Sequence, residues 1–83
     1  MAVQVIVPAE GGIEECIIFN WLKKPGDKVS AGDLIAEIET DKTTMDIVSP
    51  ADGYLLSIQY EEGETAPTLV PIAYIGEKDE KKT

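Results

Sequence analysis

Short hydrophobic runs, rich in β-branched residues, recur along the whole chain and are separated by glycine, proline and aspartate. Helical periodicity is nearly absent, and this regular spacing of runs and turn residues is typical of an all-β sandwich or barrel. We therefore expect about seven or eight short strands. The clearest of them cover residues 3–7, 16–22, 34–39, 43–48, 54–59 and 72–75.

Turn residues mark the ends of these strands. Breaks fall at Pro8, Gly11-Gly12, 25–27, 49–53 and Glu62-Gly63. Gly26, Gly53 and Gly63 are expected to be structural turn residues, since glycine reaches positive φ without the steric cost that a side chain brings. Residues 77–83 contain nothing apolar. We therefore expect one domain over 1–76 and a disordered polar tail over 77–83, the start of a linker.

The sequence carries a weak internal repeat with an offset of 37 positions. Four identities support it: Gly26 with Gly63, Ile35 with Ile72, Ala36 with Ala73, and Ile38 with Ile75. In each half, an apolar strand leads into a charged glycine turn and then into a second apolar strand. The repeat predicts a flattened barrel or sandwich of two small antiparallel sheets, related by a pseudo-two-fold axis centred near Asp41-Lys42.

A hairpin is predicted around Asp41-Lys42, taken as a two-residue loop. The cross-strand pairs are then Thr40 with Thr43, Glu39 with Thr44, Ile38 with Met45, Glu37 with Asp46, and Ala36 with Ile47. Alternate pairs fall on one apolar face that suits the core and on one polar face. Glu37 and Asp46 become like charges across the ladder, a mildly destabilising choice that packing alone does not explain.

The loop residues are not those that a tight hairpin favours. Two-residue loops prefer Asn-Gly, Asp-Gly or Gly-X, which reach positive φ cheaply, and Asp41-Lys42 is none of these. A lysine at this place points its amine into water, clear of both strands, where a modifying enzyme could form an amide. A long group attached there would have wide reach and a high local concentration. From the turn alone, however, an ordinary solvated lysine is the better interpretation.

Composition narrows the classes of function. The chain has 83 residues and a net charge of −9, which opposes nucleic acids and anionic membranes and favours protein partners with basic surfaces. One domain of this length has little room for a deep catalytic cleft. Cys16 is the only cysteine and histidine is absent, so no disulfide or metal site is expected. Without a signal peptide or an apolar run of roughly 20 residues, we expect a cytoplasmic domain. The isolated domain is expected to be monomeric.

One set of motifs resembles a known family. Glu39-Thr40-Asp41-Lys42 is followed by residues 43–47 and then by the stretch 49–53, Ser-Pro-Ala-Asp-Gly. Together with residues 5–8, the strand with Trp21, the turn 25–27 and the spacing of Gly26 and Gly53 about Lys42, this pattern is similar to the lipoyl domain of 2-oxo acid dehydrogenase complexes. The resemblance covers nearly the whole chain.

The resemblance implies lipoate in amide linkage on Lys42 of a hairpin turn, with the protein acting as a swinging-arm carrier and not as an enzyme. The implied partners are a lipoate ligase or lipoyl transferase, a thiamin-diphosphate-dependent decarboxylase, an acyltransferase core and a flavin dihydrolipoamide dehydrogenase. The resemblance favours a dihydrolipoamide acyltransferase as the parent chain and leaves open a dehydrogenase component that bears this domain at its front. The location would be the cytoplasm or, in a eukaryote, the mitochondrial matrix. The particular 2-oxo acid or acetoin complex stays open.

The expected recognition residues are Asp41 and Thr43 beside the lysine and the acidic loop with Glu10, Glu14 and Glu15. In the family this loop sits beside the lipoyl hairpin and helps the decarboxylase to recognise its carrier. Two departures stand out: Thr43 replaces the usual alanine or valine, and the opening from residue 8 to 13 differs from Pro-Asp-Ile-Gly-Glu-Gly. The second departure leaves the identity of the partner open.

Two other functions remain in view. A biotin carrier domain of a carboxylase shares the fold, but its lysine is typically flanked by methionines, whereas Asp41 and Thr43 flank Lys42. An unmodified β-barrel interaction module would make Lys42 incidental. Cys16 is interpreted as a small buried or edge residue, and Trp21 and Met45 as structural side chains.

Overall fold

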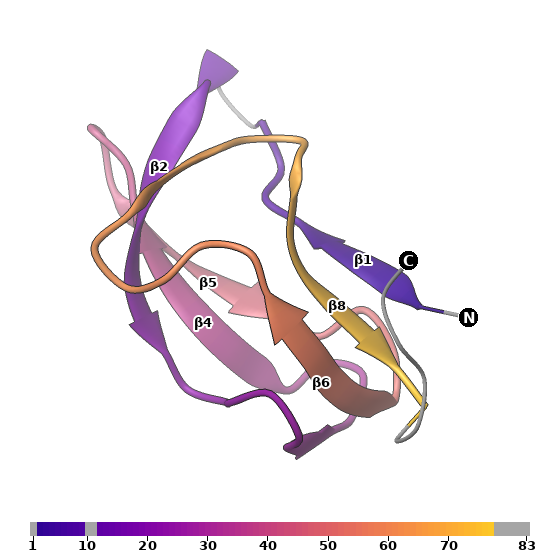
Figure 1. The fold of residues 1–83 in the computed structure, drawn as a ribbon. Helices are drawn as coiled ribbons and strands as arrows, with labels where there is room; N and C mark the ends of the chain where they lie inside the picture. Colours follow the sequence, from indigo (N-terminus) through magenta and orange to yellow (C-terminus); the bar gives the residue numbers. More distant parts are fainter. Residues whose placement is uncertain (1, 10–11, 78–83) are drawn as a thin grey trace.

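A computed structural model describes residues 2–9 and 12–77 and places eight strands in them (Figure 1). These are β1 (Val3–Ile6), β2 (Glu15–Trp21), β3 (Lys28–Val29), β4 (Leu34–Glu39), β5 (Thr44–Val48), β6 (Gly53–Ile58), β7 (Thr65–Pro67) and β8 (Pro71–Gly76). The all-β prediction is confirmed, and the two shortest strands, β3 and β7, are those that hydrophobic pattern did not single out. No helix in the described ranges is long and apolar enough to cross a membrane. The tail expected at 77–83 lies, except for Glu77, outside the described residues.

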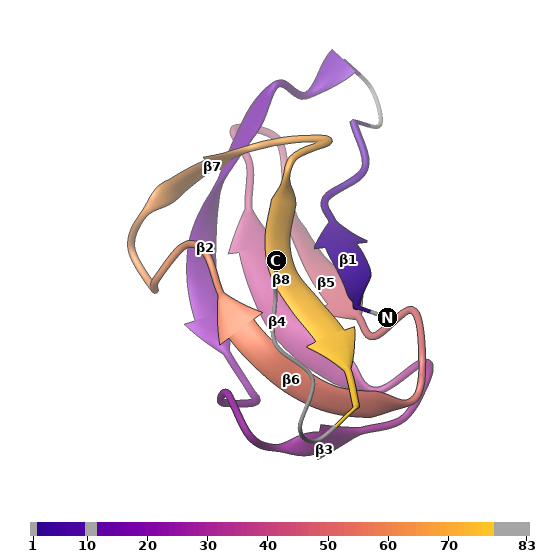
Figure 2. The ribbon, with the colours of Figure 1, turned by 45° about the vertical axis from the view of Figure 1, so that its right-hand side comes forward.

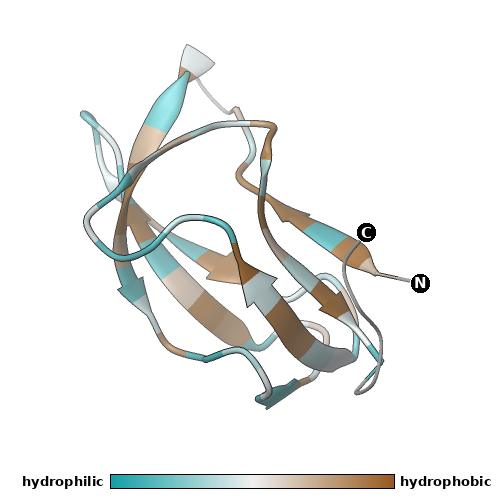
Figure 3. Ribbon diagram, in the orientation of Figure 1, coloured by the Kyte–Doolittle hydropathy of each residue, from teal (hydrophilic) through white to brown (hydrophobic). Residues whose placement is uncertain are grey.

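The strands form two four-stranded sheets with the orders β1-β8-β6-β3 and β5-β4-β2-β7, and all neighbours are antiparallel. The sheets face each other as two layers of a flattened barrel (Figure 2). Most hydrophobic stretches lie on the strands, whereas the β4–β5 and β6–β7 connections are hydrophilic (Figure 3). The alternation of side chains along each strand therefore turns one face of every sheet towards a shared core.

The predicted pseudo-two-fold symmetry is present. Advancing each strand by four places, β1 to β5 and so on to β4 and β8, converts the order of one sheet into the order of the other. The offset of 37 carries β4 onto β8 residue for residue. It also relates hydrogen bonds: Gly26 N–H donates to Leu55 O at 2.7 Å, and Gly63 N–H donates to Ile18 O at 2.8 Å. The sequence repeat is thus a repeat of backbone geometry.

Both halves contribute to the core. The repeated triplets Ile35, Ala36, Ile38 and Ile72, Ala73, Ile75 are all fully buried. Full burial of one such isoleucine contributes about 1.5–3 kcal/mol relative to exposure. Trp21 packs against this core at its edge, and its indole Nε1–H donates to Tyr60 O at 2.8 Å. Tyr60 belongs to the other half of the repeat, so this bond joins the two halves.

The β4–β5 hairpin has the predicted register. Glu39 pairs with Thr44, Ile38 with Met45, Glu37 with Asp46, and Ala36 with Ile47. Ala36, Ile38 and Ile47 are buried, whereas Glu39 and Asp46 are exposed. Glu37 accepts a hydrogen bond from the Asn20 side-chain amide on β2 at 3.3 Å, which offsets part of the repulsion from Asp46. A bulge between Leu34 and Ala36 shifts the pairing at the far end of β4.

The β4–β5 turn lies at the opposite end of the molecule from the start of β1 and the end of β8. Val3, at the start of β1, pairs with Ile75 near the end of β8. The pseudo-two-fold operation that carries β4 onto β8 and β1 onto β5 carries the β4–β5 turn onto this place. In Figures 1 and 2 the turn projects at the upper left, away from the start of β1 and the end of β8. The turn is therefore clear of the first and last strands.

Candidate functional site

The site begins with the turn between β4 and β5. Thr40 N–H donates to Thr43 O at 2.8 Å and closes the four-residue turn. Neither Asp41 nor Lys42 has a positive φ, because Leu69 is the one non-glycine residue with positive φ in the described ranges. The turn is therefore not one of the primed types that favour glycine, which agrees with the Asp-Lys sequence.

The hydroxyl of Thr40 stabilises this turn, which lacks the glycine that tight hairpin loops favour. Thr40 Oγ1 accepts the backbone N–H of Lys42 at 3.2 Å and that of Thr43 at 3.1 Å, and it donates to Thr43 O at 2.9 Å. A threonine hydroxyl that hydrogen-bonds to backbone groups two or three residues further on is a known turn-forming device. The apex is thus organised from within the turn.

Lys42 stands exposed at this apex, and Asp41, Thr43 and Thr44 around it are exposed as well. Within residues 2–9 and 12–77, the hydrogen bond recorded for Lys42 is made by its backbone N–H and not by its amine. No recorded contact of this amine with the described residues must break before an enzyme modifies it, and the exposed side chain can be approached from several directions. A primary amine at this place can act as a nucleophile and form an amide.

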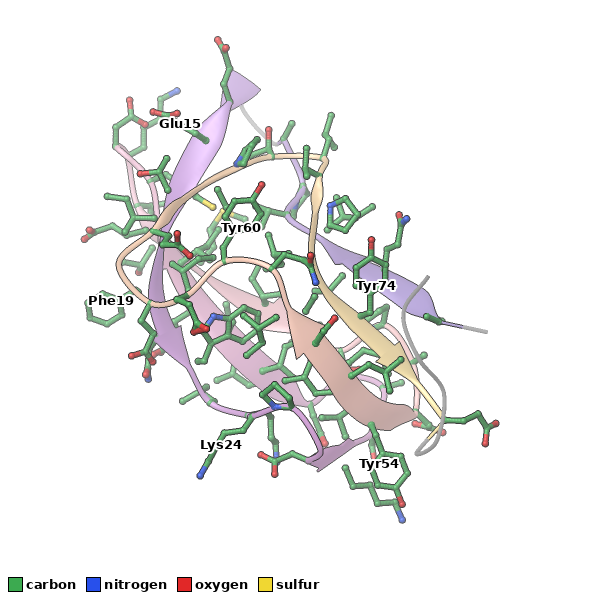
Figure 4. All side chains as sticks on the ribbon, viewed as in Figure 1. Glu15, Phe19, Lys24, Tyr54, Tyr60 and Tyr74 are labelled. Carbon is green, nitrogen blue, oxygen red and sulfur yellow. The ribbon has the colours of Figure 1, made fainter. Side chains whose placement is uncertain are left out.

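An acidic groove of about 850 Å³ lies beside the turn. The β1–β2 connection, the start of β2 and the turn line it together, with carboxylates from Glu14, Glu15, Glu39 and Asp41. Glu15 lies at the start of β2, on the same side of the molecule as the β4–β5 connection (Figure 4). The structure therefore brings Glu14, Glu15 and Asp41 together with Lys42, and Thr43 adjoins them in the turn.

Comparison with known proteins places this geometry in a family. The family model for biotin and lipoyl attachment, described as "Biotin-requiring enzyme", matches residues 3–75. The solution structure of the lipoyl domain of the 2-oxoglutarate dehydrogenase complex from Azotobacter vinelandii superposes with a TM-score of 0.74 and 32% identity, covering 90% of this chain and 96% of that one. The chain is a lipoyl domain. As such it is a carrier that is not catalytic by itself.

Two relatives of known role share the domain. The dihydrolipoyllysine-residue acetyltransferase component of the acetoin cleaving system of Bacillus subtilis is 40% identical over 96% of this chain, which spans 20% of that protein. The pyruvate dehydrogenase E1 component subunit beta of Rhizobium meliloti is 42% identical over 90% of this chain, which spans 17% of that protein. The chain thus spans about a fifth of the relatives it matches, and it resembles domains carried by different components.

The lipoyl domain holds its acidic loop in place through the β7–β8 turn. Thr68 N–H donates to Glu14 O at 3.0 Å, and Thr68 Oγ1 donates to Ile13 O at 3.0 Å. These bonds fix the end of the loop that borders the groove. Glu10, also expected to belong to this loop, lies outside the described residues.

Cys16 lines the same groove but is only 2% exposed. Burial, and to a smaller extent the neighbouring charge of Glu15, raises the pKa of its thiol. Because the thiolate is the nucleophile, the thiol is unreactive near neutral pH. Cys16 is therefore a core side chain of this lipoyl domain, as its lack of a partner cysteine in the sequence indicates.

The three expected structural glycines lie away from the groove. Gly26 and Gly63 have φ of 98° and 90° and occupy equivalent turns. Gly53 begins β6, with φ 152°, and a Cβ there would lie 2.6 Å from Gly76 O. In this position no side chain fits between β6 and the end of β8.

Sequence reasoning missed the two threonines that shape the site, Thr40 and Thr68. The signal for Thr40 was a hydroxyl residue directly before a tight turn that lacks glycine. No local pattern marks Thr68, because its partners, Ile13 and Glu14, are more than 50 positions away in sequence. Among the described residues, no three histidine, cysteine or carboxylate side chains gather to hold a metal.

Proposed function

We propose that Lys42 carries lipoate in amide linkage, and that the domain shuttles acyl groups and reducing equivalents between the active sites of a 2-oxo acid dehydrogenase-type complex. The observation that carries the proposal is the exposed Lys42 amine at the apex of a closed turn. The family relationship supports it, since the structural neighbour is a lipoyl domain.

The residues of this chain supply position and access. When bound, the dithiolane supplies the acyl-accepting and redox chemistry. The turn holds the attachment point beyond the ends of both strands, so a flexible arm on Lys42 meets no strand of its own domain. Attachment of the parent chain at the opposite end adds the motion of the whole domain to the reach of the arm.

The partners proposed are a lipoate ligase or lipoyl transferase, a thiamin-diphosphate-dependent decarboxylase, an acyltransferase core and a flavin dihydrolipoamide dehydrogenase. The names of the relatives, an acetyltransferase component and an E1 component, support this type of complex. The acidic groove beside Lys42 fits a partner with a basic surface, and the net charge of −9 attracts such a surface at long range.

Intact mass tests the attachment. The purified domain is incubated with a lipoate ligase, ATP and lipoate, and in a parallel sample with a biotin ligase, ATP and biotin. We expect the wild type to gain one lipoyl group and no biotinyl group. Lys42→Arg should gain nothing while remaining folded, whereas Lys24→Arg, which changes another exposed lysine in a turn, should gain one group as the wild type does. Modification of Lys42→Arg would overturn the proposal.

Reductive acylation tests the partner surface. Lipoylated Glu14→Ala and Glu15→Ala variants should show a lower kcat/KM with the cognate decarboxylase, because each removes a carboxylate from the groove. Asp41→Ala, Thr43→Ala and Glu10→Ala extend the series to the remaining expected residues. Glu61→Ala is the matched control, since Glu61 is exposed and lies outside this groove. Equal kcat/KM for all variants would contradict a role of the acidic loop in recognition by the decarboxylase. It would not contradict the attachment of lipoate to Lys42.

A further inference from the structure

One hydroxyl organises the apex that displays Lys42. A threonine hydroxyl has one proton to donate and two lone pairs to accept with. Thr40 Oγ1 uses all three: it donates to Thr43 O at 2.9 Å, and it accepts from Lys42 N–H at 3.2 Å and from Thr43 N–H at 3.1 Å. The backbone on both sides of the Lys42 α-carbon is therefore tied to one oxygen atom.

No other described element supports this apex. The recorded backbone hydrogen bonds of the turn run between Thr40 and Thr43, and none joins residues 40–43 to another strand or loop. Asp41 and Lys42 are exposed, so packing restrains them little. Water can replace the lost hydrogen bonds if the hydroxyl is removed, so the fold would survive while the apex would sample more conformations.

We propose that Thr40 is a positioning residue, which presents Lys42 to the enzyme that attaches lipoate. This inference rests on the proposed function. In the attachment step, the neutral Lys42 amine attacks the carbonyl carbon of a lipoyl group that the ligase has activated as a mixed anhydride. The N–C bond forms, the bond to the phosphate-type leaving group breaks, and the proton displaced from nitrogen passes to solvent or to a base on the ligase. Correct placement of the attacking atom governs the rate of such a step.

Initial rates of lipoylation test the proposal. Thr40→Val keeps the shape of the side chain and removes the hydroxyl, and we expect it to lower the ligase kcat/KM by about ten-fold or more. Thr40→Ser keeps the hydroxyl and should stay within about two-fold of the wild type. Thr44→Val is the matched control, because Thr44 is exposed and its hydroxyl makes no recorded hydrogen bond. Equal kcat/KM for wild type and Thr40→Val would overturn the proposal.

Amide hydrogen exchange supplies a readout that does not depend on lipoylation. In the wild type, the Lys42 and Thr43 amides should exchange more slowly than exposed amides without partners, and Thr40→Ser should preserve that protection. In Thr40→Val, or in Thr40→Ala if the valine variant does not fold, both amides should exchange about ten-fold faster or more, while amides of the β6–β8 pair stay unchanged. Unprotected Lys42 and Thr43 amides in the wild type would contradict the hydroxyl contacts.

The two readouts separate the possible failures. A wild type that takes up no lipoate contradicts the proposed function, while its exchange data still test the apex. A wild type that is lipoylated at the same kcat/KM as Thr40→Val contradicts the positioning role alone.

Discussion

Two kinds of turn serve different purposes in this domain. Four turns place their third residue in the left-handed region: Gly26 (φ 98°), Gly32 (92°), Gly63 (90°) and Leu69 (65°). In each, the N–H of that residue donates to a carbonyl of a distant segment, namely Leu55, Ser49, Ile18 and Val7, at 2.7–2.9 Å. The offset of 37 relates Gly26 to Gly63 and Gly32 to Leu69. These turns hold the two halves together.

The β4–β5 turn, here called the display turn because it exposes Lys42, is built differently from these four holding turns. It has no positive φ, and its recorded hydrogen bonds stay within residues 40–44. Three of the four holding turns have glycine at the bend, and the fourth has Leu69. An added Cβ at Gly26, Gly32 or Gly63 would meet nothing within 4 Å, so positive φ and not packing favours glycine there. A turn that displays a lysine needs a side chain at its apex, and the Thr40 hydroxyl allows it without strained backbone. The turns that join the two halves and the turn that exposes Lys42 therefore rely on different residues.

The largest effect on stability is expected at Gly53, where an added Cβ would clash with the backbone at the end of β8. In Gly53→Ala the new Cβ would meet the backbone oxygen of Gly76 at 2.6 Å, and neither atom can move without disturbing the β6–β8 pairing. We expect a loss of about 3 kcal/mol in the free energy of unfolding, measured by urea denaturation. A loss below about 0.5 kcal/mol would show that the strands separate easily here.

A smaller effect is expected when one holding turn is compared with the display turn. Gly63→Ala places a side chain at φ 90° and should cost about 1–2 kcal/mol. Asp41→Ala, at an exposed position without positive φ, should change the free energy of unfolding by less than about 0.5 kcal/mol. The two variants are measured side by side by urea denaturation, and equal losses would contradict the distinction between the turns.

The third prediction has the opposite sign. Leu69 occupies a left-handed position where its symmetry mate is Gly32, and its side chain is 65% exposed, so little packing is lost on substitution. Leu69→Asn should raise the free energy of unfolding by up to about 1 kcal/mol, because asparagine tolerates this backbone region better than leucine does. Thermal denaturation of the variant checks it. A lower melting temperature would mean that the leucine side chain contributes more through contacts than its backbone costs.

The smallest effect concerns the pH dependence of stability, and it arises from the buried thiol of Cys16, which lines the groove beside the turn. Burial raises the thiol pKa in the folded state above its value in the unfolded chain. The protonated thiol therefore makes its full contribution to the free energy of unfolding below the pKa of the unfolded thiol. This contribution is lost as the pH rises through the pKa of the folded state. Wild type should lose slightly more stability than Cys16→Ala across this alkaline range, measured by urea denaturation. Parallel pH profiles would contradict the raised pKa.

The sequence predicted the holding framework well and the display turn only in part. Repeated glycines and the Ile-Ala-x-Ile pattern are local signals that predicted the symmetry and the two sheets. The β4–β5 register followed from placing Asp41-Lys42 as a two-residue loop. Leu69 could not be predicted as the counterpart of Gly32, because leucine carries no signal for positive φ and tertiary contacts impose it. β3 and β7 are too short to show a hydrophobic pattern. The role of Thr40 depends on where its hydroxyl points, which only the folded turn determines.

The most direct test of the central claim is to locate the attached group. The wild-type domain is lipoylated and cleaved after glutamate, which releases residues 40–61, a peptide in which Lys42 is the only lysine. The account predicts that the entire lipoyl mass lies on this peptide and that fragmentation assigns it to Lys42. A lipoyl group on Lys23, Lys24 or Lys28, or no lipoyl group at all, would contradict the claim that this turn displays the attachment site.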